Sequence, residues 1–158
     1  MNSEFDIFSA HILVVDDQAV NVELLAQLLE GAGYSQVSTT MNPHEVCALH
    51  AQNHYDLILL DLKMPGMDGF QVMEGLALNK NDRYLPVIVL TAEPAHKIRA
   101  LKAGAKDFIS KPFDLLEVKT RIYNMLEVRL LYKKLANYSH LLELAMQQAL
   151  PDISAADR

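Results

Sequence analysis

Five side chains that could carry out chemistry each follow a short apolar or β-prone segment of the chain. These residues are Asp16, Asp17, Asp61, Thr91 and Lys111. If the segments are strands of one parallel sheet, their carboxyl ends meet at a single edge, where α/β proteins bind ligands. The sequence therefore predicts that three carboxylates, one hydroxyl and one ammonium group share a cleft.

Three ionised carboxylates beside a single lysine leave an excess of negative charge in that cleft. Like charges at short distance raise each other's pKa or require a counter-cation. A few carboxylate oxygens, with water completing the coordination, are typical of Mg²⁺, and Mn²⁺ accepts the same ligands. Carboxylates also act as nucleophiles in phosphoryl transfer, where a lysine and a hydroxyl can stabilise the transferred group. This pattern indicates phosphoryl transfer to a carboxylate beside a divalent metal.

Apolar or β-prone segments alternate with helical patterns along the chain. Strands are predicted at 12–15, 36–40, 57–60, 86–90 and 108–110. Apolar residues at helical spacing, with Pro and Gly at the ends, predict a helix after each strand. The last helix should begin after Asp114 and run to Leu150, where Pro151 is expected to end it and leave a polar tail over 152–158.

The strand segments are apolar enough to be buried on both faces, which is typical of parallel sheets with helices on either side. Right-handed crossovers produce that arrangement. The first, third and fourth strands are the most apolar and should be central. We therefore predict an α/β fold, a doubly wound five-stranded parallel sheet of flavodoxin-like order 2-1-3-4-5, with an extended C-terminal helix.

The motifs resemble the response-regulator receiver domain of bacterial two-component signalling over roughly residues 10–125. Five pieces in the family's order carry the resemblance: Ile12–Asp17, Asp61–Gly69, Val89–Ala92, Ala103–Ala105 and Phe108–Phe113. The resemblance implies that Asp61 accepts a phosphoryl group from a histidine kinase or phosphotransfer protein, and so controls a downstream output. In itself such a chain is a phosphoacceptor and not an enzyme.

The resemblance also implies roles for the neighbouring residues. The implied ligands of Mg²⁺ (or Mn²⁺) are Asp16, Asp17, Asp61 and the backbone carbonyl of Lys63. The groups implied to bind the phosphoryl group or to switch with it are Thr91, the backbone of Ala92, Lys111 and the aromatic Phe108. The Lys111–Pro112 peptide bond is expected to be cis, as it is in the family.

Several of these residues have simpler interpretations. Asp16 and Asp17 could cap a helix, Thr91 could end a strand, Lys111 could be a turn residue, and Phe108 could be a core aromatic. As a whole, the chain could be a phosphorylation-independent interaction module of the same fold. That alternative predicts erosion of the acidic pair, the acceptor or the lysine, and none is eroded.

Two other functions of the same fold fit less well, as does a second metal site. A flavin phosphate would be repelled by Asp16 and Asp17, and an aspartyl phosphatase usually needs a cap domain for which no residues are left. A second group of possible metal ligands lies on one predicted helix: His44, Cys47, His50 and His54. We interpret this group as surface and half-buried helix residues.

The predicted last helix continues past the receiver-like region with an apolar seam. Apolar residues at alternating steps of three and four are Val128, Leu131, Leu135, Tyr138, Leu142, Ala145 and Ala149. Such a seam predicts pairing with a second copy, as in a coiled coil. The stretch 126–144 also resembles connectors to enzymatic output domains, so an output domain outside this chain is expected, with a free-standing receiver as the alternative. We divide the chain into an N-terminal lead (1–10), a receiver domain (11–125) and a helical extension (126–158).

The composition limits the partners and the compartment. A net charge of −6 makes nucleic acid a poor partner. No segment approaches the ~20 apolar residues that a membrane-spanning helix requires, so we expect no membrane insertion. A single cysteine, Cys47, excludes an internal disulfide and fits a reducing compartment, so a cytoplasmic location is expected.

Overall fold

The computed structural model describes residues 6–78 and 84–156, with side chains described up to residue 149. Its centre is one parallel sheet in the order β2-β1-β3-β4-β5. The strands are β1 (His11–Val15), β2 (Gln36–Thr40), β3 (Leu57–Asp61), β4 (Val87–Thr91) and β5 (Asp107–Ser110). The predicted fold class and strand order are thus confirmed, with the three most apolar strands at the centre.

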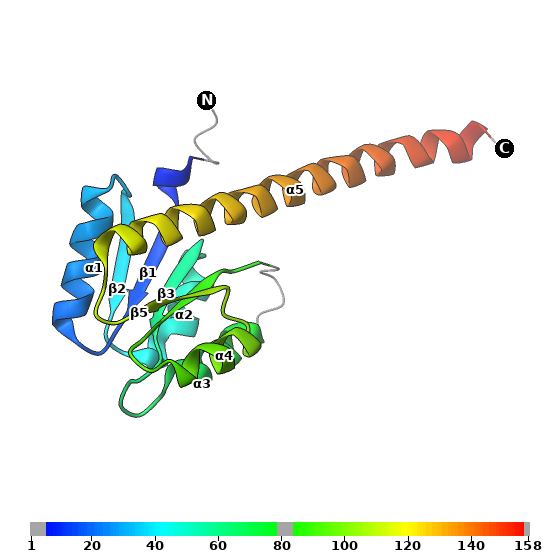
Figure 1. Cartoon of the computed structure of the whole chain (residues 1–158). Coiled ribbons are helices and arrows are strands. Elements are labelled where there is room, and N and C mark those ends of the chain that lie inside the picture. Colours follow the sequence, from blue (N-terminus) through cyan, green and yellow to red (C-terminus); the bar gives the residue numbers. More distant parts are fainter. Residues whose placement is uncertain (1–5, 79–83, 157–158) are drawn as a thin grey trace.

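Helices follow the strands on both faces of the sheet (Figure 1). They are α1 (Ala19–Gly31), α2 (Val46–Asn53), α3 (Gly69–Ala77), α4 (Ala95–Lys102) and α5 (Leu115–Ala156), with short 3₁₀ turns η2 (Ile7–Ser9) and η3 (Pro43–Glu45). Local sequence explains several starts. Asn42 caps η3 by accepting a hydrogen bond from the backbone of His44, and Asp68 forms a capping box with Gln71 at the start of α3.

Alternation along the strands produces two apolar cores, one on each face of the sheet. In β1, Ile12 and Val14 face α1 and α5, whereas Leu13 and Val15 face α2, α3 and α4. Because β3 and β4 are buried along their whole length, they can only be central strands. The two cores hold the carboxyl ends of the strands in register at one edge of the sheet.

The last helix, α5, differs from the prediction in two respects: the domain boundary placed within it and the residue at which it ends. Leu126 and Leu130 are buried against the sheet, so the domain's core extends past the boundary proposed at 125/126, which falls inside α5. Pro151 does not end α5, which continues to Ala156, so the prediction of a polar tail from residue 152 is wrong for 152–156. A proline removes one backbone hydrogen bond from a helix without always terminating it. Residues 157–158 of that tail lie outside the described residues.

Part of the N-terminal lead belongs to the folded domain, because residues 7–10 pack on it. Phe8 contacts the rings of Tyr34 and Tyr123, and Ala10 is buried. Residues 1–5 of the lead lie outside the described residues.

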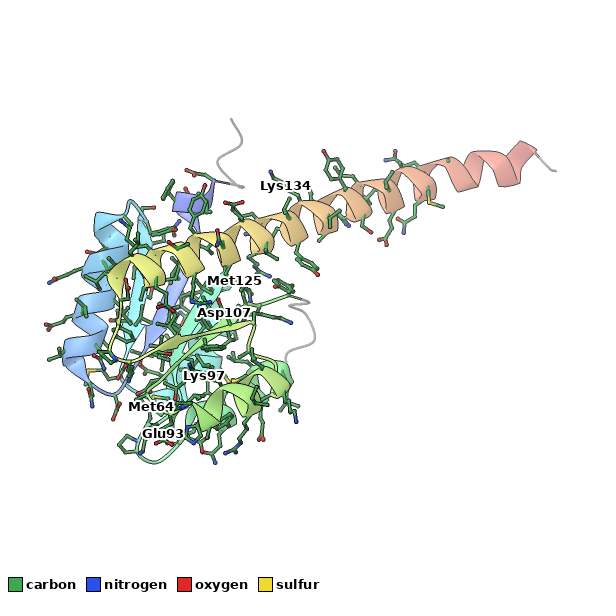
Figure 2. All side chains as sticks on the ribbon, in the orientation of Figure 1. Met64, Glu93, Lys97, Asp107, Met125 and Lys134 are labelled. Atoms are coloured by element: carbon green, nitrogen blue, oxygen red, sulfur yellow. The ribbon has the colours of Figure 1, made fainter. Side chains whose placement is uncertain are left out.

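Beyond the sheet, α5 projects away from the rest of the domain (Figure 1). Figure 2 shows Met125 on the part of α5 that lies over the domain and Lys134 on the part that extends past it. Within the described residues, no helix is both long and apolar enough to span a membrane.

Candidate functional site

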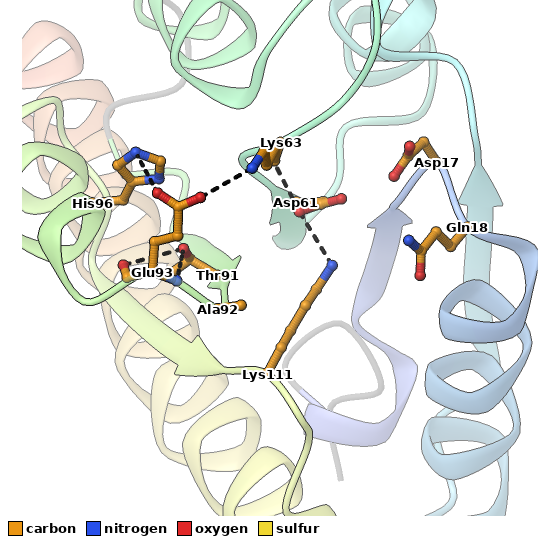
Figure 3. A pocket seen from close by; sticks show the side chains of 9 residues that line it. All are labelled: Asp17, Gln18, Asp61, Lys63, Thr91, Ala92, Glu93, His96 and Lys111. Atoms are coloured by element: carbon orange, nitrogen blue, oxygen red, sulfur yellow. Dashed lines mark hydrogen bonds and ion pairs between the residues drawn. The ribbon is translucent and has the colours of Figure 1, made fainter.

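The predicted site residues meet at the carboxyl edge of the sheet around a cavity of about 230 Å³ (Figure 3). Its lining residues are Asp17, Gln18, Asp61, Lys63, Thr91, Ala92, Glu93, His96 and Lys111. They come from the carboxyl ends of β3 and β4, from the loops after β1, β3, β4 and β5, and, for His96, from α4. The convergence predicted from strand ends is therefore present in the structure.

Asp16 lies at the base of the site and is fully buried. Its carboxylate accepts hydrogen bonds from the backbone of Gln18 (3.0 Å) and from the side chain of Asn21 (3.2 Å). The Nζ of Lys111 lies 3.2 Å from Oδ2 of Asp16, the oxygen that also accepts from Asn21. These contacts give the buried Asp16 carboxylate hydrogen-bonded and charged partners in place of solvent.

Asp61 ends β3 and lies opposite Lys111, whose Nζ is 3.3 Å from its Oδ1. The backbone N–H of Lys63 donates to the same oxygen over 3.3 Å. Asp16, Asp17 and Asp61 each offer a carboxylate oxygen, and these atoms lie within 4.8 Å of one another. Three hard oxygen donors at this spacing fit a divalent cation with water completing its coordination.

The loop after β3 is held close to the sheet by Gly69. A Cβ atom at this position would lie 2.7 Å from the backbone oxygen of Asp61 and 2.8 Å from the Cα of Leu62. Only glycine permits this approach, and its N–H donates to the Leu62 carbonyl over 3.0 Å. The start of α3 therefore helps to place the Asp61 carboxylate.

Burial raises the pKa of the Asp61 carboxyl from its usual 3.8 to about 7. The negative charge of Asp16 acts in the same direction, and a shared hydrogen bond with Asp17 adds to it. Lys111 and the backbone N–H of Lys63 oppose the shift without cancelling it. A cation placed between Asp61 and its acidic neighbours would therefore lower the pKa of Asp61 and stabilise its ionised form.

Thr91 lies beside the cavity at the end of β4, but its hydroxyl is engaged locally. It accepts from the backbone N–H of Glu93 (3.1 Å) and lies 3.4 Å from the Glu93 carbonyl. Ala92 also lines the cavity, so its backbone is available there. Both residues are where the resemblance implied.

The mouth of the cavity contains two residues that we did not single out from the sequence, Glu93 and His96. The Glu93 carboxylate lies 3.1 Å from Lys63 Nζ and 3.3 Å from His96 Nε2, and joins the loops after β3 and β4 (Figure 3). Lys63 and His96 hold the pKa of Glu93 below its usual range. The position of Glu93, two residues after Thr91 at the strand end, was the signal available in the sequence.

Phe108 does not line the cavity. It is half-buried on β5 with Lys97 Nζ 4.6 Å and the Arg121 guanidinium 5.8 Å from its ring centre. The aromatic ring therefore lies between α4 and α5, and Phe108 precedes Lys111 by three residues. The Lys111–Pro112 peptide bond is cis, as expected.

The His and Cys residues of the second helical segment do not form a metal site within the described part of the chain. His50 is buried, and its Nδ1 accepts a hydrogen bond from the backbone of Tyr55 (3.1 Å) while the two rings stack. His54 ends α2 in a left-handed conformation at φ 53°. These residues close the end of α2.

The family follows from the sequence together with this geometry. Residues 12–123 match the protein family described as response regulator receiver domain. The chain belongs to that family.

Named relatives agree with the assignment to the receiver-domain family. Response regulator PleD of Caulobacter vibrioides is 40% identical over 129 residues, which make up 80% of this chain and 28% of PleD. Transcriptional regulatory protein ResD of Bacillus subtilis is 40% identical over 117 residues, 73% of this chain and 47% of ResD. The chain therefore spans less than half the length of either relative.

Solved receiver structures have the same fold. The chemotaxis response regulator CheY4 of Vibrio cholerae superposes with a TM-score of 0.66 at 29% identity, covering 72% of this chain and 98% of CheY4. The receiver domain of sensor histidine kinase PA1611 from Pseudomonas aeruginosa has a TM-score of 0.69 at 27% identity, covering 75% of this chain and 98% of that domain. Its structure contains a magnesium ion coordinated in the active-site cleft.

Proposed function

We propose that this receiver is a phosphorylation-activated signalling switch whose phosphoacceptor is Asp61. One observation carries the proposal: the Asp61 carboxylate lines an open cavity, with an oxygen within 4.8 Å of the acidic pair and 3.3 Å from the Lys111 ammonium. In the transfer, an oxygen of Asp61 forms a bond to phosphorus, and the bond from phosphorus to the donor's histidine nitrogen breaks. The donor would be a histidine kinase or a phosphotransfer protein.

The remaining residues of the cavity then have defined tasks. Lys111 would exchange its carboxylate contact for a phosphoryl oxygen, which keeps its charge compensated throughout. Thr91 would rotate its hydroxyl from the Glu93 backbone toward the phosphoryl group, with the Ala92 N–H as a second donor. We propose that Phe108 reports the change to the α4–α5 surface, because it lies three residues before Lys111 and between those helices.

We propose Mg²⁺, or Mn²⁺, as the cofactor, held by Asp16, Asp17, Asp61 and the backbone carbonyl of Lys63. The three carboxylates have the donor type and spacing for it. When bound, the ion would neutralise the carboxylates and the incoming phosphoryl oxygens. The buried contacts of Asp16 to Lys111 and Asn21 indicate that Asp17, which is more exposed, is the carboxylate that adjusts to the ion.

Acetyl phosphate tests the proposed phosphoacceptor directly. Incubation with acetyl phosphate and Mg²⁺ should add the mass of one phosphoryl group to the intact chain, in a form that hydroxylamine removes. Asp61→Asn should gain no such mass, because Asp16, which also lies beside Lys111, is fully buried and does not line the cavity. An Asp61→Asn protein that gains the same mass would contradict the assignment. Glu74→Gln, which removes an exposed carboxylate on α3, is the matched control and should be phosphorylated normally.

Replacing Asp17 should distinguish its role in metal binding from its effect on the stability of the fold. Asp17→Asn removes one of three neighbouring negative charges, so the variant should be more stable than the parent when no divalent ion is present. It should also gain less from Mg²⁺, because stabilisation by a ligand follows its affinity for the folded chain. Thermal melts with and without Mg²⁺ measure both effects. An unchanged response to Mg²⁺ would contradict the role of Asp17.

We further propose that the receiver controls an output that lies outside this chain, in the cytoplasm. The chain covers 28% of PleD and 47% of ResD, so both relatives have additional sequence. Projection of α5 away from the domain gives such an output a continuous helical connection. A phosphorylation-independent interaction module is the alternative, and the acetyl phosphate experiment distinguishes the two.

We also propose that the projecting part of α5 pairs in parallel with α5 of a second copy. The five proposed contact residues are all exposed: Val128, Leu131, Leu135, Tyr138 and Leu142. Pairing two copies in register places no charged side chain on the seam, and each buried Leu contributes about 1.5–3 kcal/mol before the entropy of association is subtracted. We expect a dissociation constant in the micromolar range.

Light scattering at about 100 μM protein tests the dimer. The full chain should have the mass of a dimer, whereas a chain ending at Lys134 should be a monomer. This truncation keeps Leu126 and Leu130, which belong to the core. Leu135→Glu combined with Leu142→Glu should also give monomers, while Asn137→Glu, an exposed position off the seam, should leave the dimer intact. A full chain that is monomeric at this concentration would contradict the pairing.

A further inference from the structure

A second charged cluster lies at the opposite edge of the sheet from the candidate site. Asp56 directly precedes β3 and is 4% exposed. Its Oδ2 accepts a hydrogen bond from the backbone N–H of His11 (2.9 Å), and its own N–H donates to the His11 carbonyl (2.7 Å). Two bonds in opposite directions fix both the backbone and the carboxylate of Asp56 against β1.

Two cations from α5 converge on the other carboxylate oxygen. Lys133 Nζ lies 3.0 Å and Arg129 Nε 3.4 Å from Asp56 Oδ1. The two residues are four positions apart, so they lie on the same face of the helix. Arg129 is largely buried and also donates to the backbone carbonyl of Tyr84. Charge-assisted hydrogen bonds of this kind are directional, so they constrain the rotation of α5 as well as its distance from the sheet.

An aromatic contact supports the same part of α5. The rings of Tyr84 and Tyr132 stack with their centres 4.0 Å apart and their planes within 6°. The Tyr84 hydroxyl lies 3.8 Å from the sulfur of Met125, which is about two helical turns before Tyr132. Together with Asp56, these contacts hold α5 against the domain between Met125 and Lys133.

The apolar seam lies on the side of α5 that the cluster leaves free. Each residue turns the helix by about 100°. Arg129 and Lys133 therefore point toward the sheet, and Leu131 and Leu135 point away from it, with exposed fractions of 57% and 64%. Earlier on that same side the helix carries Glu117 and Arg121, which are paired with each other at 2.9 Å. On this side of α5, the charged pair is followed from Val128 onward by the apolar seam.

We propose that Asp56, Arg129 and Lys133 form an anchor that sets the direction and rotation of α5, and so turns the seam away from the receiver toward a second copy of the chain. The orientation of the helix stands on the contacts above, while its use in pairing rests on the proposed dimer. Because β3 begins directly after Asp56 and ends at Asp61, one strand connects the anchor with the proposed phosphoacceptor.

A small change in the tilt of α5 at the anchor produces a large displacement at the end of the helix. From residue 133 to residue 149 the helix extends for roughly 24 Å at 1.5 Å per residue, so a tilt of about 10° moves its end by about 4 Å. Misdirection on this scale is measurable as a broader range of distances between the domain and the end of α5.

Electron–electron distance measurement between two spin labels tests the anchor. The labels are placed at Glu23→Cys on α1 and Gln148→Cys near the end of α5, both exposed, in a Cys47→Ala background. Dilution with unlabelled protein restricts the signal to distances within one chain. The parent should show a narrow distribution, and Lys133→Met should broaden it at least about twofold. Lys119→Met, which removes an exposed lysine earlier on α5, is the matched control and should leave it unchanged.

Two further comparisons keep the result interpretable. Asp56→Asn should broaden the distribution more than Lys133→Met, because it removes the charge that both cations share. If that variant does not fold, Lys133→Met decides alone, since Lys133 is partly exposed and its loss leaves the Arg129 pair in place. A distribution for Lys133→Met as narrow as that of Lys119→Met would overturn the anchor. Because the labels report within one chain, failure of the dimer would leave this result unaffected and would appear only in light scattering.

Discussion

Asp61→Asn should stabilise the domain at about pH 8 in the absence of divalent ions and leave its stability unchanged at about pH 3, where Asp61 is protonated in both the folded and the unfolded chain. The Asp61 carboxyl has a pKa of about 7 in the folded chain, against 3.8 for an ordinary aspartate. It therefore holds its proton more tightly when folded, and unfolding releases that proton at pH values between the two. The free energy of unfolding of the parent should fall as the pH rises through this range. Asn carries no such charge and should not show this decline.

The expected difference is large for a single substitution. The change from 3.8 to about 7 corresponds to a gain of up to about 4 kcal/mol for Asp61→Asn above pH 7. Urea unfolding across the pH range, with a chelator present, measures it. Glu74→Gln removes an exposed carboxylate and should follow the parent at every pH. An Asp61→Asn curve parallel to that of the parent would show that the folded domain does not raise the pKa of Asp61.

Lys111→Met should nearly abolish phosphoryl transfer, because it removes a positive charge from the site, whereas Asp61→Asn removes a negative one. Lys111 is the cation that faces both Asp16 and Asp61, at 3.2 and 3.3 Å. Without it, the pKa of Asp61 should rise further, because its attraction is one of the two influences that lower that pKa. Loss of one preorganised donor to a transferring group typically costs about 10²–10³-fold in rate. We therefore expect phosphorylation by acetyl phosphate to slow by about that factor.

Intact-mass measurements over time give the rate for this comparison. Lys102→Met removes an exposed lysine on α4 and should be phosphorylated as fast as the parent. A Lys111→Met variant that is folded and reacts at the rate of Lys102→Met would exclude Lys111 from phosphoryl binding.

Much of the fold could be predicted because the sequence patterns are local. Solid apolar runs such as 57–60 indicate strands buried on both faces, and Asn42 with Pro43 marks a helical start. The convergence of Asp16, Asp61 and Lys111 also follows from strand order alone, since parallel strands end at one edge. What the resemblance added was the cis peptide bond and the roles of individual residues.

The features that were not predicted depend on contacts between distant parts of the chain. Asp56 and Lys133 are separated by 77 positions, and neither has a neighbour in sequence that indicates the pairing. The same limitation applies to the boundary at 125/126, because the burial of Leu126 and Leu130 depends on where α5 crosses the sheet. Proline usually lies at helix ends, but α5 continues past Pro151 to Ala156, so the local preference predicts the wrong end for this helix. Local patterns locate elements, whereas these contacts depend on packing.

The most direct test of the central claim is to identify the phosphorylated residue chemically. An aspartyl phosphate is an acyl phosphate, which borohydride reduces to homoserine with release of phosphate. After reaction with acetyl phosphate and Mg²⁺, reduction and digestion, peptide mass spectrometry should find homoserine in place of Asp61. Homoserine at Asp16, Asp17 or any other position, with Asp61 unchanged, would contradict the account.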